Sequence, residues 1–294
     1  MLAEQLINGL TLGSIYALIA IGYTLVFGVL DIINMAHGEI FMFGAFAGML
    51  MSMKLGAPLP VAFLGSVALT AAMGYVLELL ALRPLRRPSG NMEGNAGLST
   101  LISTIGVAII LENLSLKLFG AENQPFRTSF GNVKFTIGPV NIYLIQIVIL
   151  LASGVLICGL ALWLKRSRSG RALRATAESP ETAALMGVDT KKIITTAVVT
   201  ASAMAGTAGV LVAMSFSNVG TRMGVSMGLK GLAIIVFGGM GSVNGALVGG
   251  IILGMAETLV VAYGDSGYRD AIAFVIIIGV LLLKPKGLFG QNAS

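Results

Sequence analysis

The interval from Lys165 to Lys192 reads KRSRSGRALRATAESPETAALMGVDTKK and stands between two long apolar blocks. It carries seven basic residues against three acidic ones. Basic residues accumulate in the cytosolic loops that flank membrane-spanning helices. The neighbouring apolar blocks are long enough for such helices, which need about 20 residues each. The interval is therefore predicted to be a cytosolic loop of a membrane protein.

Within this interval, the residues from Ser179 to Gly187 carry the signals of one short helix. Ser179 is a good N-cap, and Pro180 suits the first helical position, where a missing N–H has no cost. Glu181 lies in the first turn, where the helix dipole favours an acid. Gly187 can close the helix as a C′ glycine, and Asp189 can cap the next helix. We expect a structured, exposed helix that contacts a cytosolic partner.

The composition of the chain indicates its class. The 294 residues are 56% hydrophobic and 11% charged, whereas soluble domains carry about 25% charged residues. The formal net charge of +6 does not indicate nucleic-acid binding, because the basic residues cluster in short loops beside apolar segments. The predicted fold class is an all-α polytopic membrane protein with a single transmembrane domain over residues 1–294.

Nine apolar segments predict about eight or nine transmembrane or re-entrant helices. The segments are 3–28, 36–53, 60–82, 98–118, 142–164, 191–217, 228–238, 246–263 and 268–284. Segments 36–53 and 228–238 are short for a bilayer, and the sequence leaves open whether 228–238 crosses or re-enters. Small-xxx-small pairs allow close helix contact within one chain or between two chains, and they are Gly44/Gly48, Gly245/Gly249 and Gly250/Gly254.

The basic stretches 83–87, 165–192 and 284–286 are predicted to face the cytosol. Two predicted spans separate the first pair of stretches, and four separate the last pair if 228–238 crosses. Three spans precede Arg83, which predicts an external N-terminus. The C-terminus is predicted to be cytosolic.

A second informative stretch, Asp31–Glu39, reads DIINMAHGE and interrupts two apolar segments with the chain's one histidine. Residues of this region recur at a constant offset near a second break, where Val26-Phe27-Gly28, Asn34, Ala36 and Gly44 match Val236-Phe237-Gly238, Asn244, Ala246 and Gly254. Either chance or an internal repeat explains these matches. If the repeat is real, two broken hairpins face each other and mark a transport pathway. The pathway candidates are Asn34, His37, Glu39, Gly238, Gly239, Gly241, Ser242 and Asn244.

Two interpretations stay open for the polar residues of these breaks. His37 and Glu39 either carry protons or bind substrate, or else they cap and anchor the second helix at the cytosolic interface. Asn34 and Asn244 are predicted to cap the helices that follow them, which would also aim helix N-termini at the pathway.

Three acidic residues lie in or near predicted spans. Glu78 and Glu257 are expected to reach an interface, whereas Glu112 lies deeper and is expected to pair with a polar group on a neighbouring helix. None stands with both a second carboxylate and a histidine, as a proton relay requires. This pattern argues against ion-coupled transport.

No catalytic motif is visible in the sequence. The chain has one histidine and one cysteine, no zinc-ligand spacing, no G-x-S-x-G motif and no phosphate-binding P-loop. We therefore expect no enzymatic activity, no metal and no cofactor in this chain. If transport is driven by ATP, the ATPase is a separate polypeptide, and the loop 165–192 is where it would dock.

Three stretches carry a family resemblance: Asn8–Ser14 (NGLTLGS), Ile33–Glu39 (INMAHGE) and Phe237–Ser242 (FGGMGS). With them, nearly the whole chain resembles the permease subunits of branched-chain amino acid ABC importers, the LivH type. The loop helix also resembles the general ABC permease pattern E-A-A-x-x-x-G, with Thr182 in place of the first alanine. The coupling residues that this resemblance implies are Ser179, Pro180, Glu181, Ala183, Ala184 and Gly187.

The resemblance also implies an assembly in the bacterial inner membrane, surrounded by lipid. Its other members would be a second related permease of the LivM type, two cytosolic ATP-binding subunits that hold ATP and magnesium, and an external solute-binding protein. Helix 180–186 would then seat in a groove on one ATPase. The alternatives are a urea or amide ABC permease of the same architecture, or a secondary transporter or channel that acts alone.

Overall fold

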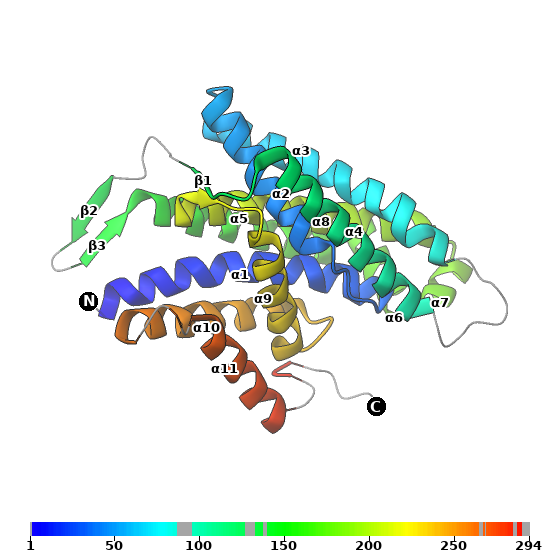
Figure 1. Cartoon of the computed structure of the whole chain (residues 1–294). Helices are drawn as coiled ribbons and strands as arrows, with labels where there is room; N and C mark the ends of the chain where they lie inside the picture. Colours follow the sequence, from blue (N-terminus) through cyan, green and yellow to red (C-terminus); the bar gives the residue numbers. More distant parts are fainter. Residues whose placement is uncertain are drawn as a thin grey trace.

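The structure is a computed structural model, and it describes residues 2–86, 96–126, 133–137, 140–264, 267, 269–284 and 287–289. Almost all of these residues are helical (Figure 1). The main helices are α1 (Leu2–Leu30), α2 (His37–Met49), α3 (Leu59–Leu77), α4 (Ala96–Phe119), α5 (Leu144–Arg166), α8 (Thr190–Phe216), α9 (Met223–Gly238), α10 (Val243–Tyr263) and α11 (Arg269–Leu283). Each predicted apolar segment lies almost wholly on one of these helices or on its direct continuation, which confirms the all-α polytopic class.

Shorter elements continue or join these helices. The continuations are η1 (Leu50–Lys54) after α2, and η2 (Glu78–Leu82) and η3 (Arg83–Arg86) after α3. Two short helices, α6 (Arg168–Glu178) and α7 (Pro180–Leu185), occupy the predicted loop. The strands form two antiparallel pairs, β1 (Gln124–Pro125) with β4 (Asn218–Val219) and β2 (Lys134–Ile137) with β3 (Val140–Tyr143).

Among the described residues, six helices are long and apolar enough to cross a membrane: α1, α3 with its continuation, α4, α5, α8 and α10. Helix α9 has 16 residues, so it is about 24 Å long, which is less than the roughly 30 Å of a bilayer core. In Figure 1 it runs across the direction of α1 and α10. Of the two alternatives that the sequence left open for segment 228–238, the length and direction of α9 favour re-entry, and the cytosolic C-terminus stays a prediction.

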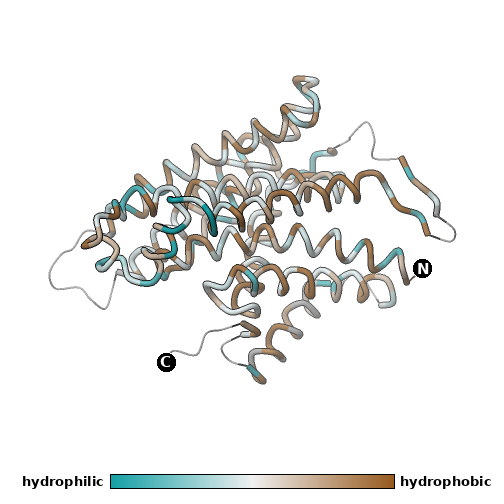
Figure 2. The backbone as a smooth tube through the Cα atoms, turned by 180° about the vertical axis from the view of Figure 1, so that it is seen from behind, coloured by the Kyte–Doolittle hydropathy of each residue, from teal (hydrophilic) through white to brown (hydrophobic). Residues whose placement is uncertain are grey.

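The two ends of the bundle differ in character. The N-terminal end of α1 lies beside the β2–β3 hairpin, where the Glu4 carboxylate accepts hydrogen bonds from the backbone and side-chain N–H groups of Asn141 at 3.0 and 3.1 Å. Helices α6 and α7 lie at the opposite end (Figure 1). Hydrophilic residues gather around α6 and α7 (Figure 2). The start of α1 and the loop 165–192 therefore lie at opposite ends of the bundle, and the external N-terminus stays a prediction.

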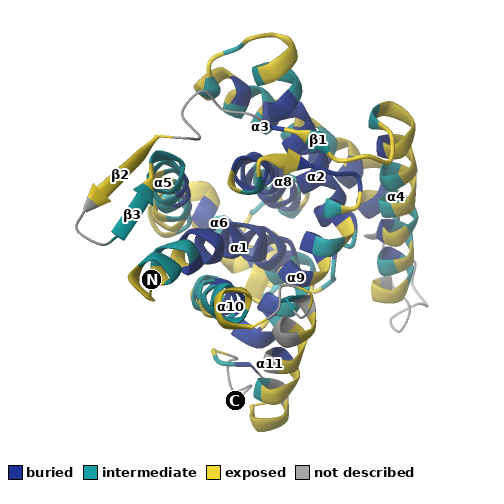
Figure 3. Cartoon of the chain, turned by 60° about the vertical axis from the view of Figure 1, so that its left-hand side comes forward, coloured by how far each residue is buried: buried dark blue, intermediate teal, exposed yellow. Residues whose placement is uncertain are grey.

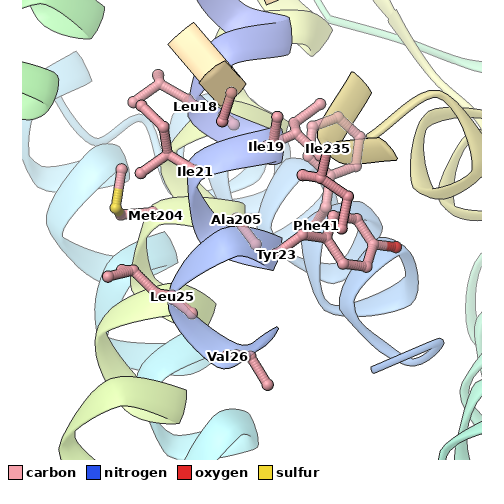
Figure 4. Close-up of a cluster of buried hydrophobic side chains, with 14 of the residues drawn as sticks. Leu18, Ile19, Ile21, Tyr23, Leu25, Val26, Phe41, Met204, Ala205 and Ile235 are labelled. Atoms are coloured by element: carbon pink, nitrogen blue, oxygen red, sulfur yellow. The ribbon is translucent and has the colours of Figure 1, made fainter. Parts of the chain in front are cut away.

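Helices α1 and α8 form the centre of the bundle, and most of their residues are buried (Figure 3). Leu18 and Ile19 of α1 belong to one buried hydrophobic cluster with Phe41 of α2, Ala205 of α8 and Ile235 of α9 (Figure 4). Helix α4 stands at the edge, and much of its surface is exposed (Figure 3). Within the polar break after α1, Asn34 and Ala36 are buried, whereas Asp31 is exposed.

The three small-xxx-small pairs pack within this chain. A Cβ on Gly44 would lie 2.3 Å from the Cα of Gly206, and one on Gly254 would lie 2.3 Å from the Cα of Gly13. A Cβ on Gly245 would lie 2.2 Å from a backbone oxygen of α9. These glycines therefore allow backbone-to-backbone contact between helices of one subunit, the first of the two interpretations above.

Candidate functional site: a polar break, two cavities and an exposed loop helix

The loop helix α7 begins and ends at the residues predicted from the sequence. The Ser179 hydroxyl accepts a hydrogen bond from the Thr182 N–H at 3.2 Å, and Pro180 occupies the first helical position. Gly187 has a φ of +84°, and its N–H donates to the Ala184 carbonyl at 3.0 Å. The next N–H donates to the Ala183 carbonyl at 3.0 Å, which completes a Schellman motif.

Asp189 caps the helix that follows, as predicted. Its carboxylate accepts a hydrogen bond from the Lys192 N–H at 3.1 Å. This backbone hydrogen bond is the main reason why the pKa of Asp189 lies below its ordinary value. The loop therefore leads rigidly into α8, one of the two central helices.

Sequence reasoning missed α6, the other helix of the loop. The Ser167 hydroxyl caps it by accepting from the Gly170 N–H at 2.8 Å. Gly170, Leu173 and Thr176 form its buried face, while Arg171 and Arg174 are exposed. The cap and the buried residues at a spacing of three were the signals available in the sequence.

The tip of α7 presents apolar side chains to the surroundings. Leu185 is 88% exposed and Met186 is 81% exposed. Among the predicted coupling residues, Ala183 is buried, and Pro180, Glu181, Ala184 and Gly187 are exposed. Leu185 and Met186 were not singled out from the sequence, although they stand inside the E-A-A-x-x-x-G pattern.

The first polar break places Asn34 and His37 in the interior. Asn34 is 1% exposed, and its Oδ1 accepts from the Ala36 N–H at 3.1 Å, in the turn that leads into α2. His37 is the first residue of α2, and its ring centroid lies 4.4 Å from that of Tyr23. A Cβ on Gly22 would lie 2.6 Å from the His37 Nε2, so this glycine of α1 makes room for the imidazole. Both residues are enclosed by protein and do not lie at an exposed interface.

Glu39, in the first turn of α2, lines a cavity of about 190 Å³ between α2, α4 and α9. Its side chain reaches the start of α9, where a Cβ on Gly224 would lie 2.5 Å from Glu39 Oε2. Tyr23 and Glu112 line the same cavity. Glu112 also lines an adjacent cavity of about 340 Å³. Of the three candidates from the first break, Glu39 is the one that faces open space.

The second break has a different structure from the one expected. Gly239 and Gly241 have positive φ values of +103° and +84°. Ser242 caps α10 by accepting from the Gly245 N–H at 3.1 Å, whereas Asn244 is exposed, so the prediction that Asn244 is the cap is wrong. The shorter hydroxyl side chain sits at the residue that immediately precedes the helix, which is the position of an N-cap.

The two breaks do not face each other. The first lies near Gly224, in the first turn of α9, and the second begins at Gly238, the last residue of that helix. Fourteen residues of α-helix span about 21 Å. Gly238 packs instead on Gly245, and its carbonyl accepts from the Phe289 N–H at 2.9 Å.

A buried charge cluster joins α9 to α1, α10 and α11. Lys230 Nζ lies 2.9 Å from Glu257 Oε1, with the two side chains 4% and 0% exposed. The Tyr16 hydroxyl donates to Glu257 Oε2 at 2.7 Å, and Arg269 Nε donates to Glu257 Oε1. The expectation that Glu257 reaches an interface is therefore wrong. The signal in the sequence was a lone lysine within the apolar segment 228–238, since charges at membrane depth are costly without a partner.

A third cavity, of about 560 Å³, opens near the N-terminal end of α1. Asn8, Gln146, Thr258 and Arg269 contribute polar groups to its wall, and the Arg269 guanidinium carbon lies 4.8 Å from the centroid of the Phe216 ring. Within the described part of the chain, no three His, Cys, Asp or Glu side chains gather where they could hold a metal ion.

These observations define a multi-pass membrane protein with internal polar breaks and a rigid, exposed loop helix. A family model described as "Branched-chain amino acid transport system / permease component" matches residues 5–281. The chain belongs to this family.

Two curated relatives illustrate the match. The chain is 36% identical over 301 residues to the high-affinity branched-chain amino acid transport system permease protein LivH of Escherichia coli K12, covering 98% of this chain and 95% of the relative. It is 39% identical, with the same coverage, to the corresponding protein BraD of Pseudomonas aeruginosa. The solved structure of PsaBC from Streptococcus pneumoniae in complex with Fab is 15% identical, with a TM-score of 0.49 over 96% of this chain and 92% of that chain.

Proposed function

We propose that this chain is the membrane-spanning permease subunit of an ATP-driven importer, and that it forms the translocation pathway for branched-chain amino acids. The observation that carries the proposal is the 36–39% identity, over 98% of the chain, to permease proteins of branched-chain amino acid transport systems. Such near-complete coverage means that the relatives match every helix and not one local motif. The chain itself would act as one transmembrane domain without catalytic activity.

The proposed assembly contains a second permease of the LivM type, two cytosolic ATP-binding subunits that hold ATP and magnesium, and an external solute-binding protein. It lies in the bacterial inner membrane, with the start of α1 outside and α7 in the cytosol. The exposed Leu185 and Met186 support the contact with an ATP-binding subunit, because apolar side chains at the tip of a capped helix suit a groove on a partner. The rigid connection from α7 through Asp189 to α8 supports transmission of a movement to the centre of the bundle.

Uptake of radiolabelled leucine into proteoliposomes that contain the whole assembly tests this proposal. We expect uptake that requires both internal ATP and the external binding protein. Uptake without either component would contradict the proposal and indicate a gradient-driven carrier or channel. ATP-dependent uptake of urea in the absence of leucine uptake would contradict the substrate assignment but keep the class of transporter.

A further inference from the structure

The cavities between α2, α4, α9 and α11 carry acidic groups in one part and basic groups in another. The smaller cavity is lined by Tyr23, Glu39 and Glu112. The larger one is lined by Glu112, Arg222 and Lys230. The two share Glu112, together with Val225 and Leu229 of α9, so they adjoin along these three residues. The larger part alone, at about 340 Å³, falls in the size range of small-molecule sites.

The acidic part holds two buried polar side chains, Glu39 and Tyr23. Glu39 and Tyr23 are each 2% exposed, and neither Glu39 Oε2 nor the Tyr23 hydroxyl makes a hydrogen bond of ordinary geometry within the described part of the chain. The Glu39 and Glu112 carboxyls lie close enough to interact electrostatically, which makes a negative charge on the buried Glu39 more costly. Buried polar groups in native proteins are almost always hydrogen-bonded, so these groups point to a ligand that donates.

A primary ammonium group matches this arrangement. It carries three N–H donors and no acceptor, and Glu39, Glu112 and Tyr23 supply three acceptor groups around the small cavity. Its positive charge also compensates the buried carboxylate of Glu39 and the half-buried one of Glu112. Gly224 and Gly228 keep the wall of α9 free of side chains, because Cβ atoms there would lie 2.5 Å from Glu39 Oε2 and 3.2 Å from the Tyr23 hydroxyl.

The basic part matches a carboxylate. Lys230 is already engaged with Glu257 at 2.9 Å, whereas the Arg222 side chain stands at the exposed start of α9 and lines the larger cavity. The guanidinium fork is suited to a carboxylate. Val225 and Leu229 follow Arg222 on the same face of α9, at helical spacings of three and seven. With Phe274 they provide an apolar wall.

We propose that this joined cavity binds the zwitterionic head group of an aliphatic α-amino acid, with the ammonium held by Glu39, Glu112 and Tyr23 and the carboxylate held by Arg222. The aliphatic side chain lies along Val225, Leu229 and Phe274. The assignment rests on the proposed function, since it names the part of the permease that recognises the transported molecule. It gives the permease a specificity of its own, in addition to that of the external binding protein.

Binding of tritiated leucine to the purified full-length chain tests this inference directly. We expect saturable binding that unlabelled leucine and valine displace. Two analogues separate the charges, because 3-methylbutylamine lacks the carboxylate and 4-methylpentanoate lacks the ammonium. Each should compete about 10- to 100-fold more weakly than leucine, as expected for the loss of a charged hydrogen bond.

Two variants, each of which removes one charge, assign the ends of the site. Glu39→Gln and Arg222→Gln should each weaken leucine binding by about 10- to 100-fold. Glu39→Gln should leave competition by 4-methylpentanoate unchanged, and Arg222→Gln should leave competition by 3-methylbutylamine unchanged. Matched controls are Glu122→Gln and Lys117→Gln, because both side chains are exposed and line neither cavity. Their binding should equal that of the wild type.

The analogue pattern distinguishes a binding role from a general loss of structure, because a misfolded variant would lose all competitors together. The inference is overturned if the wild type shows no saturable binding, if the analogues compete as well as leucine, or if both variants bind leucine like the wild type. Uptake by the complete assembly is measured in parallel. Uptake without binding to the chain would overturn this inference and leave the proposed function standing. Binding without uptake would support this inference and contradict the proposed function.

Discussion

Replacing Glu257 by Gln tests whether the buried charge cluster holds α9 in the bundle. Lys230 and Glu257 are 2.9 Å apart, and their side chains are 4% and 0% exposed. Removing one member of a buried ion pair costs about 3–5 kcal/mol, because the other charge stays buried without its counterion. The Tyr16 hydroxyl lies 3.2 Å from Lys230 Nζ and can still accept from it. We therefore expect Glu257→Gln to lower the free energy of unfolding by about 3 kcal/mol, the low end of that range.

The opposite variant, Lys230→Met, should cost less. Glu257 then keeps the hydrogen bond from Tyr16, at 2.7 Å, and the ion pair with Arg269. We expect a loss of about 2 kcal/mol. The double variant removes both charges and should cost about 1–3 kcal/mol less than the sum of the single variants, since the two residues are in direct contact.

Equilibrium unfolding in mixed detergent micelles, followed by far-ultraviolet circular dichroism, measures these differences. The matched control is Lys192→Met, which breaks an ion pair with Asp189 at 3.2 Å in which the side chains are 84% and 51% exposed. That change should cost less than about 1 kcal/mol. The reasoning is refuted if Glu257→Gln costs no more than Lys192→Met, or if the double variant equals the sum of the singles.

Three further predictions concern the loop and the packing of the bundle. Glu181→Lys or Gly187→Pro should uncouple ATP hydrolysis from uptake at normal membrane insertion, and uptake at wild-type rates would count against the role of α7. Gly44→Ala should lower the free energy of unfolding by about 1–3 kcal/mol, because the added Cβ would lie 2.3 Å from the backbone of α8. The control is Gly154→Ala, where the added Cβ would have no atom within 4 Å, and this variant should change the melting temperature little. The Asp189 cap should stabilise the loop above the ordinary pKa of 3.8 and lose this effect as the pH falls through its lowered pKa; an Asp189→Ala difference that grows in acid would contradict this.

The loop helix shows what the sequence can predict at the level of single residues. Capping by Ser179 and Asp189 depends on N–H groups three residues further along the chain, so the local sequence contains the whole interaction. The same holds for Gly187, whose positive φ follows from the absence of a Cβ. The nine apolar segments were predictable for a similar reason, because hydropathy and helix length are both local properties.

The interior of the bundle was less predictable because its contacts join distant parts of the chain. Glu257 pairs with Lys230, 27 residues away, and with Tyr16, 241 residues away. Neither hydropathy nor periodicity states which residue of α9 faces which residue of α10. The same limit applies to the two polar breaks. Their matching residues suggested that the breaks face each other, whereas in the structure they lie at the two ends of α9. Glu39 was a candidate from its sequence motif, whereas Arg222 and Tyr23 were not, since they reach the cavity through packing alone.

Helix α9 is too short to span a bilayer and carries a lysine, yet it occupies the interior of a membrane protein. The reason is that protein, and not lipid, surrounds its polar groups. Its first turns pack on α2 beside Glu39, Lys230 is neutralised by Glu257, and the Gly238 carbonyl accepts a hydrogen bond from Phe289. A helix with these partners need not match the thickness of the bilayer, because its lysine and its C-terminal end are satisfied within the fold. Glu39 lies beside these turns, 2% exposed in the wall of a cavity, and a carboxylate in such a place is costly unless a charged partner meets it.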